Sequence, residues 1–347
     1  MPPESVEVLV FAAVALVLTA VFAEPASPRR GLVVKGGVGL AGSAAIVTVP
    51  TFDIALLVLL MVGFLQAVIG GVRPFEVRLR PVVLAVALTA AGLVFARATG
   101  PEVLARFGAV GLGAGLAAMI GLLPYIHVFE GDEPVAPSPF AWLAFLGPVV
   151  ATVFVARTQQ ELTADAWAAF GAILIGLGFL NLVWGSLATW LATSTAAAWR
   201  YSFIADWGLA LCAFGLTVID GRRAALLVLF SVTLCRLPLY LLWRHAAGER
   251  PVKDRPVNLV VAAALAGSAP FAGFAARLLL LRAATQVFWP LALVLALGML
   301  LWLPGSLRLG RGVALPRGRQ VAAVVVVLAV NAAAGLYPLP LLSAARL

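Results

Sequence analysis

Side chains that hold metals and redox cofactors are nearly absent from this sequence, which contains two cysteines and two histidines in 347 residues. Cys212 and Cys235 lie within apolar segments and lack the spacing of metal ligands, so we expect both to be packing residues. The sequence also has no Cys–His or paired-carboxylate cluster. It therefore contains no recognisable metal, haem or iron–sulfur motif, and we expect the chain to bind no cofactor.

Charged residues are scarce as well. They make up 11% of the chain, against 63% hydrophobic residues and a mean hydropathy of +1.07, and this composition excludes an ordinary soluble domain. A helix needs about 20 apolar residues to cross a membrane, so the sequence predicts about twelve spans joined by short loops. We expect an all-α polytopic protein that forms one integral membrane domain over residues 1–347. The predicted spans lie near residues 5–23, 31–49, 53–71, 81–99, 106–126, 139–156, 166–192, 198–219, 224–243, 257–281, 286–304 and 320–341.

The formal net charge of +9 does not indicate nucleic-acid binding, because the basic residues are distributed as topology signals. They gather in loops at alternate ends of the predicted spans. The positive-inside rule places such loops in the cytoplasm, and therefore both termini outside. The residues concerned are Arg29, Arg30, Arg73, Arg78, Arg80, Arg244, Arg250, Lys253, Arg255, Arg308, Arg311, Arg317 and Arg319.

One apolar run, residues 257–281, is interrupted near its middle by Gly267, Pro270 and Gly273, and Arg277 follows. Proline removes a backbone donor and clashes with the preceding turn, so we expect the helix to break there. The freed peptide groups cannot face lipid and must be buried in protein or line a wet cavity. A broken helix beside an intramembrane cation is typical of ion-translocating proteins. The alternative is a kinked packing helix whose arginine pairs with a neighbour.

A second proline, Pro124, interrupts the predicted fifth span near its end. The loop behind it is rich in titratable side chains, which makes it a candidate part of a proton pathway. The alternative is an ordinary acidic loop at the membrane surface. The titratable residues of the loop are His127, Glu130, Asp132 and Glu133.

Two further charged residues lie inside predicted spans: Asp206 in one and Arg236, followed by Pro238, in the next. An ionisable residue within a span is costly and is a functional candidate by default. Asp206, Arg236 and Arg277 can meet in one bundle interior. We expect Asp206 and Arg277 to pair, directly or through water, because two isolated buried charges would each bear a desolvation cost.

Three segments, in chain order, resemble motifs of one family. Residues 121–139 resemble G-x-x-P-F-H-x-W-x-P-x-x-x-x-G-A-P-x-P, residues 200–208 resemble A-Y-S-S-I-A-H-M-G, and residues 268–277 resemble G-x-P-x-x-x-G-F-x-x-K. The family is that of the antiporter-like membrane subunits of respiratory complex I, the bacterial NADH:quinone oxidoreductase. It also includes the large subunits of Mrp-type cation/proton antiporters. The chain resembles the N-type subunit of complex I most, in a diverged and shortened form.

The resemblance implies a non-catalytic subunit in the membrane arm of such an oxidoreductase, or of a related respiratory or hydrogenase complex. It implies a location in the bacterial cytoplasmic membrane, with the lipid bilayer and other membrane-arm subunits as partners and a quinone site nearby. The implied role is in proton translocation or in its membrane scaffold. The candidate residues of the proton pathway are then Asp206, Arg236, Arg277, His127 and Glu130.

The pattern of spans agrees with two inverted repeats, which are common in membrane transporters. Residues 31–156 and 166–304 each hold five predicted spans, and the fourth span of each set is the interrupted one, at Pro124 and at Pro270. The remaining parts are a first span with its loop and a last span, residues 1–30 and 320–341.

The sequence departs from the family at positions where the family relays protons. The resemblance implies a lysine shortly before the first broken-helix proline, a lysine in the following helix and a glutamate in the third predicted span. This chain has Met119 and Val149 at the first two positions, and Gln66 is the polar residue nearest to the third. The distal positions hold Arg236 and Arg277, and arginine stays protonated in proteins, so it cannot hand on a proton.

These departures leave two alternatives to a proton-translocating subunit. One is a degenerate, non-pumping structural subunit of the same kind of complex. The other belongs to a different class, a multispan enzyme that acts on lipid-linked substrates. In that enzyme, the acidic residues beside His127 would form an interfacial site.

Overall fold

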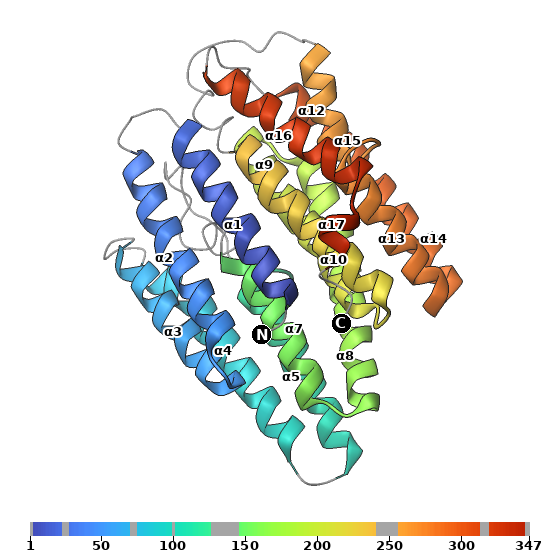
Figure 1. Ribbon diagram of the computed structural model, residues 1–347. Helices are drawn as coiled ribbons and strands as arrows, with labels where there is room; N and C mark the ends of the chain where they lie inside the picture. Colours follow the sequence, from blue (N-terminus) through green and yellow to red (C-terminus); the bar gives the residue numbers. More distant parts are fainter. Residues whose placement is uncertain are drawn as a thin grey trace. The chain divides into compact units, whose positions relative to one another are not determined.

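The computed structural model describes residues 3–22, 28–69, 75–98, 101–125, 146–240, 256–312 and 319–343 (Figure 1). Within these ranges all regular structure is helical, and no strand is present. A helix satisfies its own backbone groups, which is what an apolar chain requires in a membrane. A helix or a pair of consecutive helices occupies each of the predicted apolar segments.

Five helices in the described part of the chain are long and apolar enough to cross a membrane, and several shorter helices are also apolar. The chain is therefore a multi-pass membrane protein. The five are Leu79–Arg97, Glu102–Ile120, Ala164–Leu191, Ile219–Tyr240 and Trp289–Arg311. The shorter ones are Gly36–Thr48, Phe52–Val68, Pro256–Ala266 and Val321–Leu336.

The chain packs as two compact units. Unit 1 consists of residues 1–16 and 26–174, and unit 2 of residues 17–25 and 175–347. The division falls within helix α8 (Ala164–Leu191).

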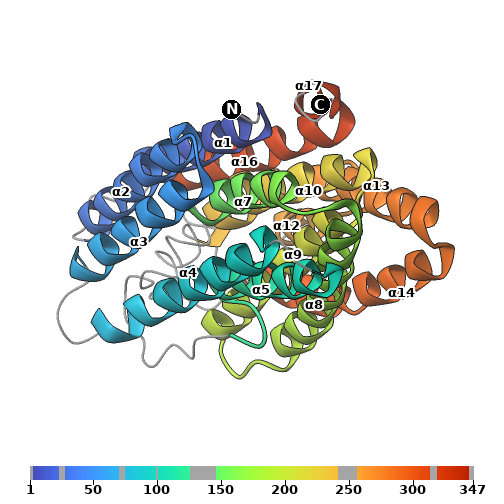
Figure 2. The ribbon, with the colours of Figure 1, turned by 90° about the horizontal axis from the view of Figure 1, so that it is seen from below.

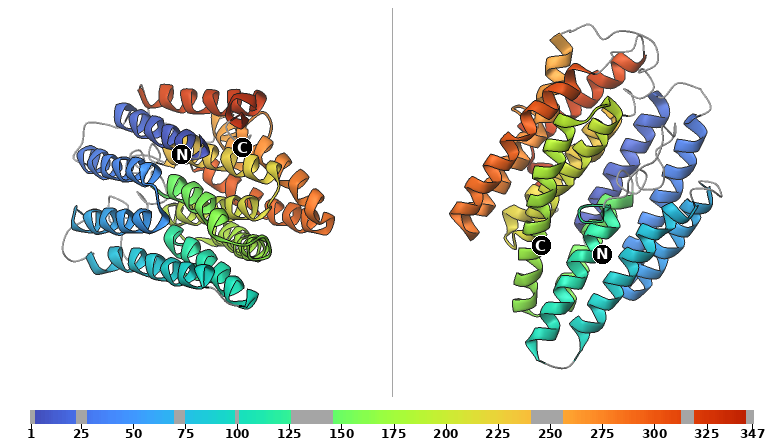
Figure 3. Two further views of the ribbon diagram at one scale, coloured as in Figure 1. Left: turned by 60° about the horizontal axis from the view of Figure 1, so that its bottom comes forward. Right: turned by 180° about the vertical axis from the view of Figure 1, so that it is seen from behind.

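Unit 1 is built from helices that pack in chain order. Neighbouring pairs among α2, α3, α4 and α5 are in contact, and the colours in Figure 3 follow this order from blue to teal. Helices α4 and α5 approach closely through glycines: a Cβ on Gly92 or on Gly108 would lie 2.7 Å from a backbone nitrogen of the facing helix. Small residues allow this approach in membrane proteins. The helices of unit 1 are α1 (Pro3–Phe22, as far as Leu16), α2 (Pro28–Thr48), α3 (Phe52–Ile69), α4 (Phe75–Arg97), α5 (Glu102–Ile120), α7 (Gly147–Glu161) and the first part of α8.

Unit 2 is centred on α10 (Ile219–Ser231), which continues through a π-helical turn, η2 (Val232–Arg236). In the spanning helix Ile219–Tyr240, 89% of the apolar stretch is buried, against 33–56% in the other four long apolar helices. Helix α10 packs against α9 and α13 (Figure 2). Polar residues on α10 and η2 are therefore surrounded by protein rather than by lipid. The other helices of unit 2 are the second part of α8, α9 (Thr195–Gly215), α12 (Pro256–Ala266), α13 (Ala272–Val287), α14 (Trp289–Leu300), α15 (Trp302–Arg311), α16 (Arg319–Leu336) and α17 (Leu339–Leu342).

Glycines also bring α8 and α9 together within unit 2. A Cβ on Gly178 would lie 2.6 Å from the backbone nitrogen of Cys212, and a Cβ on Gly185 would lie 2.6 Å from that of Ala205. The close approach fixes the rotation of α9, the helix that carries Asp206. Cys212 is buried at this contact, and its thiol donates to the Ile175 carbonyl at 3.6 Å. Cys212 therefore packs between the two helices, as the sequence predicts.

Candidate functional site

The predicted helix break in unit 2 is present. Helix α12 ends at Ala266 and α13 begins at Ala272. Gly267 has a φ of +63°, in the left-handed region that closes many helices at their carboxyl end. The Ser268 backbone N–H and hydroxyl both donate to the Ala263 carbonyl, at 3.0 and 2.7 Å. The last turn of α12 is thus closed by the chain itself.

Side chains from three other elements bond to two further backbone groups at the break. The Leu265 carbonyl accepts from Arg236 Nη2 at 3.2 Å and from Trp302 Nε1 at 2.9 Å. The Ala272 backbone N–H donates to Asn331 Oδ1 at 2.8 Å. These freed peptide groups are buried in protein, which is one of the two arrangements open to a break inside a membrane.

Helix α16 lies directly against the break. A Cβ on Gly335 would meet backbone atoms of Pro270, Phe271 and Ala272, so no side chain fits there. Asn331 lies one turn earlier on the same helix and is fully buried. Helix α16 thus contacts the break through a glycine and an asparagine side chain.

Asp206 forms an ion pair with Arg236. The pair joins Arg236 Nε on η2 to Asp206 Oδ2 on α9, and the two residues are 3% and 7% exposed. The guanidinium also lies over the ring of Trp302, 4.6 Å from the ring centroid. Removing either residue should destabilise the protein, because it leaves an uncompensated buried charge.

Arg277 occupies a different position from the one expected. Its guanidinium lies at Gly267, where the carbon atom Cζ is 2.9 Å from the place that a Cβ would occupy. It interacts electrostatically with Asp206 and Arg236, but among the described residues it forms no hydrogen bond or ion pair. The direct partner of Asp206 is therefore Arg236. A direct ion pair between Asp206 and Arg277 is not present among the described residues, and their pairing through water stays a prediction. Long side chains in helices point toward the amino end, which directs Arg277 to the break.

The carboxyl end of α12 helps to stabilise the excess positive charge. The described cluster holds two arginines and one aspartate. Both guanidinium groups lie beside the carboxyl end of α12: that of Arg236 is at the Leu265 carbonyl, and that of Arg277 is at Gly267. The carbonyl end of a helix carries a partial negative charge of about half an elementary charge. The break thus supplies part of the counter-charge that the side chains lack.

The break in unit 1 has the same local pattern and different surroundings. Helix α5 ends at Ile120, Gly121 has a φ of +78°, and Pro124 follows at the same G-x-x-P spacing as Gly267 and Pro270. Both prolines are preceded by a cis peptide bond. Gly121 N donates to the Ala117 carbonyl at 3.0 Å. The predicted site residues His127 and Glu130, with Asp132 and Glu133, lie outside the described residues.

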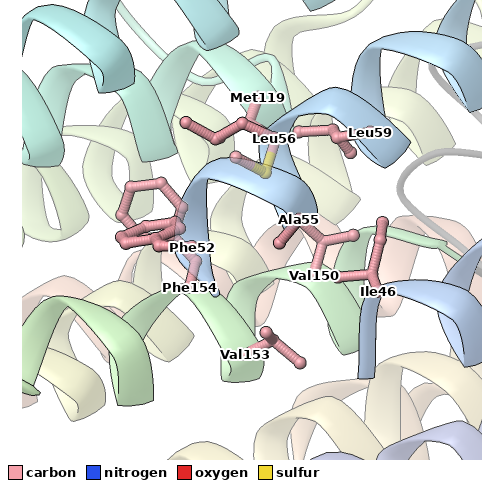
Figure 4. Close-up of a pocket in the computed structure, with 9 residues that line it drawn as sticks. All are labelled: Ile46, Phe52, Ala55, Leu56, Leu59, Met119, Val150, Val153 and Phe154. Atoms are coloured by element: carbon pink, nitrogen blue, oxygen red, sulfur yellow. The ribbon is translucent and has the colours of Figure 1, made fainter. Parts of the chain in front are cut away.

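Beside this break, a small void in unit 1 is lined by apolar side chains only (Figure 4). Met119, at a position where the family resemblance implies a lysine, is one of the lining residues. Val149, at the second such position, is fully buried, and Gln66 is 2% exposed. The lining residues come from α2, α3, α5 and α7 and are Ile46, Phe52, Ala55, Leu56, Leu59, Met119, Val150, Val153 and Phe154.

Sequence reasoning placed Asp206, Arg236, Arg277 and the break together, and it missed Trp302 and Asn331. The only signal for Asn331 is its position as a polar residue in the apolar segment 320–341. Trp302 gave no signal, because nothing in the sequence distinguishes it from the other tryptophans.

Known proteins resemble this chain in structure but not in sequence. No protein-family model matches the chain, and no curated protein matches it in sequence. A chain in the structure of the Mrp complex from Dietzia sp. DQ12-45-1b has a TM-score of 0.79 and 15% identity, with 99% of this chain and 44% of that chain covered. A chain of respiratory complex I from Thermus thermophilus with bound NADH has a TM-score of 0.76 and 16% identity, with 100% and 84% covered. This chain shares their fold.

A third structure has the same fold. A chain of the membrane-bound sulfane sulfur reductase (MBS), an archaeal respiratory membrane complex, has a TM-score of 0.75 and 16% identity, with 99% of this chain and 81% of that chain covered. The chain spans less than half the length of the Mrp-complex chain and more than four fifths of the other two. The resemblance that the sequence motifs indicated, to antiporter-like subunits of respiratory membrane complexes, is confirmed at the level of the fold.

Proposed function

We propose that this chain is an antiporter-like membrane-arm subunit of an NADH:quinone oxidoreductase or of a related respiratory or hydrogenase complex. The observation that supports this proposal most is the buried Asp206–Arg236 pair beside a helix break, in a chain that shares its fold with chains of such complexes over its whole length. In this role the chain carries no reaction of its own. It binds other membrane-arm subunits and the lipid bilayer, near a quinone site of the assembled complex.

Asp206 is the proposed proton-exchanging group of unit 2. Arginine stays charged in proteins, so Arg236 and Arg277 can set the field around a proton but cannot carry one. Asp206 is the buried carboxylate that contacts this cluster, and it lies on a helix whose rotation is fixed by close glycine contacts. Protonation of Asp206 would release Arg236 from its ionic partner at the break.

The proposed architecture has about twelve spans, with two inverted five-helix repeats over residues 31–156 and 166–304. The paired G-x-x-P breaks with left-handed glycines support this arrangement, because corresponding interruptions are typical of inverted repeats. The proposed location is the bacterial cytoplasmic membrane, with both termini outside, as the distribution of arginines predicts.

A second candidate function, a non-pumping structural subunit, is favoured by the apolar void of unit 1. There the described residues supply no titratable lining. The multispan-enzyme alternative depends on acidic residues outside the described ranges, and no observation supports it.

One experiment separates the two candidate functions. Proton flux is measured in vesicles reconstituted with the native complex and is divided by the amount of assembled complex. If Asp206 exchanges protons, Asp206→Asn abolishes the normalised flux. Unchanged normalised flux, with or without reduced assembly, would rule out Asp206 as the proton-exchanging group and would favour the structural role. Mass spectrometry of the purified native complex identifies the companion subunits, and migration as a free monomer would contradict the proposed complex.

A further inference from the structure

Trp302 contacts both halves of the candidate site through different parts of its side chain. Its indole N–H donates to the Leu265 carbonyl at 2.9 Å, at the end of α12. Its ring faces the Arg236 guanidinium at 4.6 Å. Trp302 is 1% exposed and begins α15, which packs along α12. A buried indole N–H needs an acceptor, and the one that Trp302 meets is a backbone carbonyl at the break. The stacking of its ring on Arg236 is a second contact with the same site.

The Arg236 guanidinium is held on three sides. Nε faces the Asp206 carboxylate, Nη2 donates to the Leu265 carbonyl, and the face of the group lies against the Trp302 ring. A planar guanidinium suits this arrangement, since it donates from its edges and stacks through its face. The Leu265 carbonyl accepts from both side chains, and therefore Trp302 and Arg236 meet at the same backbone oxygen.

We propose that Trp302 is a positioning residue, which fixes the Arg236 guanidinium at the end of α12 and so couples the Asp206–Arg236 pair to the helix break. The inference deepens the proposed function and rests on it, because Asp206 is the proton-exchanging group assigned there. With Trp302 in place, Arg236 keeps two of its three contacts when the charge of Asp206 is neutralised. The cation then stays at the break instead of following the carboxylate.

The charged groups that face Asp206 within the described residues are Arg236, from η2, and Arg277, from α13. Arg277 lies at Gly267, whereas the Trp302 ring faces the Arg236 guanidinium. A substitution at Trp302 should therefore affect Asp206 by way of Arg236. A tryptophan that only fills space would have no such effect on Asp206.

A double-mutant cycle in the full-length chain tests the coupling. Trp302→Leu removes the stacking ring and the N–H donor, and Asp206→Asn removes the ionic partner of Arg236. Thermal unfolding of the detergent-purified protein should show a Tm roughly 4 °C lower for Trp302→Leu in the parent chain. In the Asp206→Asn background the same substitution should lower the Tm by less than half as much, because contacts in one network are not additive.

Trp199→Leu is the matched control. Trp199 is as buried as Trp302 and lies in the same unit, and its ring contacts Tyr240 at 5.8 Å. Its effect on the Tm should be the same in both backgrounds. Equal effects of Trp302→Leu in the two backgrounds would overturn the proposal, since additivity is what a space-filling tryptophan predicts.

A milder variant keeps the test decisive if Trp302→Leu does not fold. Trp302→Phe retains a ring for Arg236 and loses only the bond to the Leu265 carbonyl. Hydrogen–deuterium exchange of residues 262–276 should be about fivefold faster in this variant, as expected for the loss of one hydrogen bond at the break. Unchanged exchange in Trp302→Phe would contradict the proposal. Neither measurement depends on proton flux, so the proposed function can fail while the coupling stands.

Discussion

Arg236→Met should destabilise the protein by about 3 kcal/mol, because it leaves Asp206 as a buried charge without a direct partner. Removal of one member of a buried ion pair costs about 3–5 kcal/mol in general. The lower end applies here, since Arg277 remains within electrostatic range of Asp206. Methionine keeps an unbranched side chain and can still contact the Trp302 ring, so the loss of packing is small. The Leu265 carbonyl keeps its bond from Trp302.

The assay is thermal unfolding of the purified full-length chain, with wild type and variant at the same protein and detergent concentrations. A loss of about 3 kcal/mol corresponds to a Tm lower by roughly 4 °C for a chain of 347 residues. Arg106→Met is the control. It removes one member of an exposed i,i+4 pair, Arg106–Glu102, in which both side chains are more than half exposed. Such a pair contributes about 0–1 kcal/mol.

The double variant Arg236→Met with Asp206→Leu decides whether the cost arises from the unpaired charge. Replacing both members of a buried pair with apolar residues is often neutral or stabilising. The double variant should therefore be more stable than Arg236→Met alone. If the double variant were less stable by the sum of two single losses, the cost would come from packing, and the electrostatic reasoning would be refuted.

Three further predictions concern α16 and the topology. Asn331→Leu should destabilise the protein by about 1–3 kcal/mol in thermal unfolding, because the buried Ala272 N–H loses its acceptor. Asn331→Asp keeps an acceptor and should retain that hydrogen bond. Gly335→Ala should lower the Tm, because the new Cβ forces α16 away from the break. The control Gly37→Ala places its Cβ where nothing lies within 4 Å, so it should not lower the Tm. Equal effects of the two substitutions on the Tm would contradict the tight contact at Gly335. Tyr337→Cys in a cysteine-free variant should react with a membrane-impermeant maleimide added outside intact cells, and labelling only after permeabilisation would reverse the topology.

The sequence predicted the helices and the break because both depend on local properties. Apolar runs of membrane length form helices wherever they occur, and Gly267 with Pro270 cannot continue one. The cluster of Asp206, Arg236 and Arg277 was also predictable, since the cost of charges within spans brings them together. The partner of Asp206 was not predictable. It depends on the π-helical turn at Val232–Arg236 and on the glycine contacts that set the rotation of α9.

Trp302 and Asn331 were missed for a related reason. Their roles come from which backbone group they face, and this is set by how α15 and α16 lie against the break rather than by sequence spacing. An asparagine or a tryptophan in an apolar segment has many candidate partners. The contributions of His127 and Glu130 stay predictions, because these residues lie outside the described ranges.

The two breaks show that the same backbone pattern can serve different chemistry. Each has a left-handed glycine three residues before a proline, yet the break at Gly267 contacts Arg236, Arg277 and Asn331, whereas the void beside the break at Gly121 is lined by apolar side chains. An ordered water needs two to four polar partners, which that lining does not supply. The described lining of this void therefore offers no proton relay of its own. In the described cluster of unit 2, Asp206 is the group that can exchange a proton, because the two arginines stay charged.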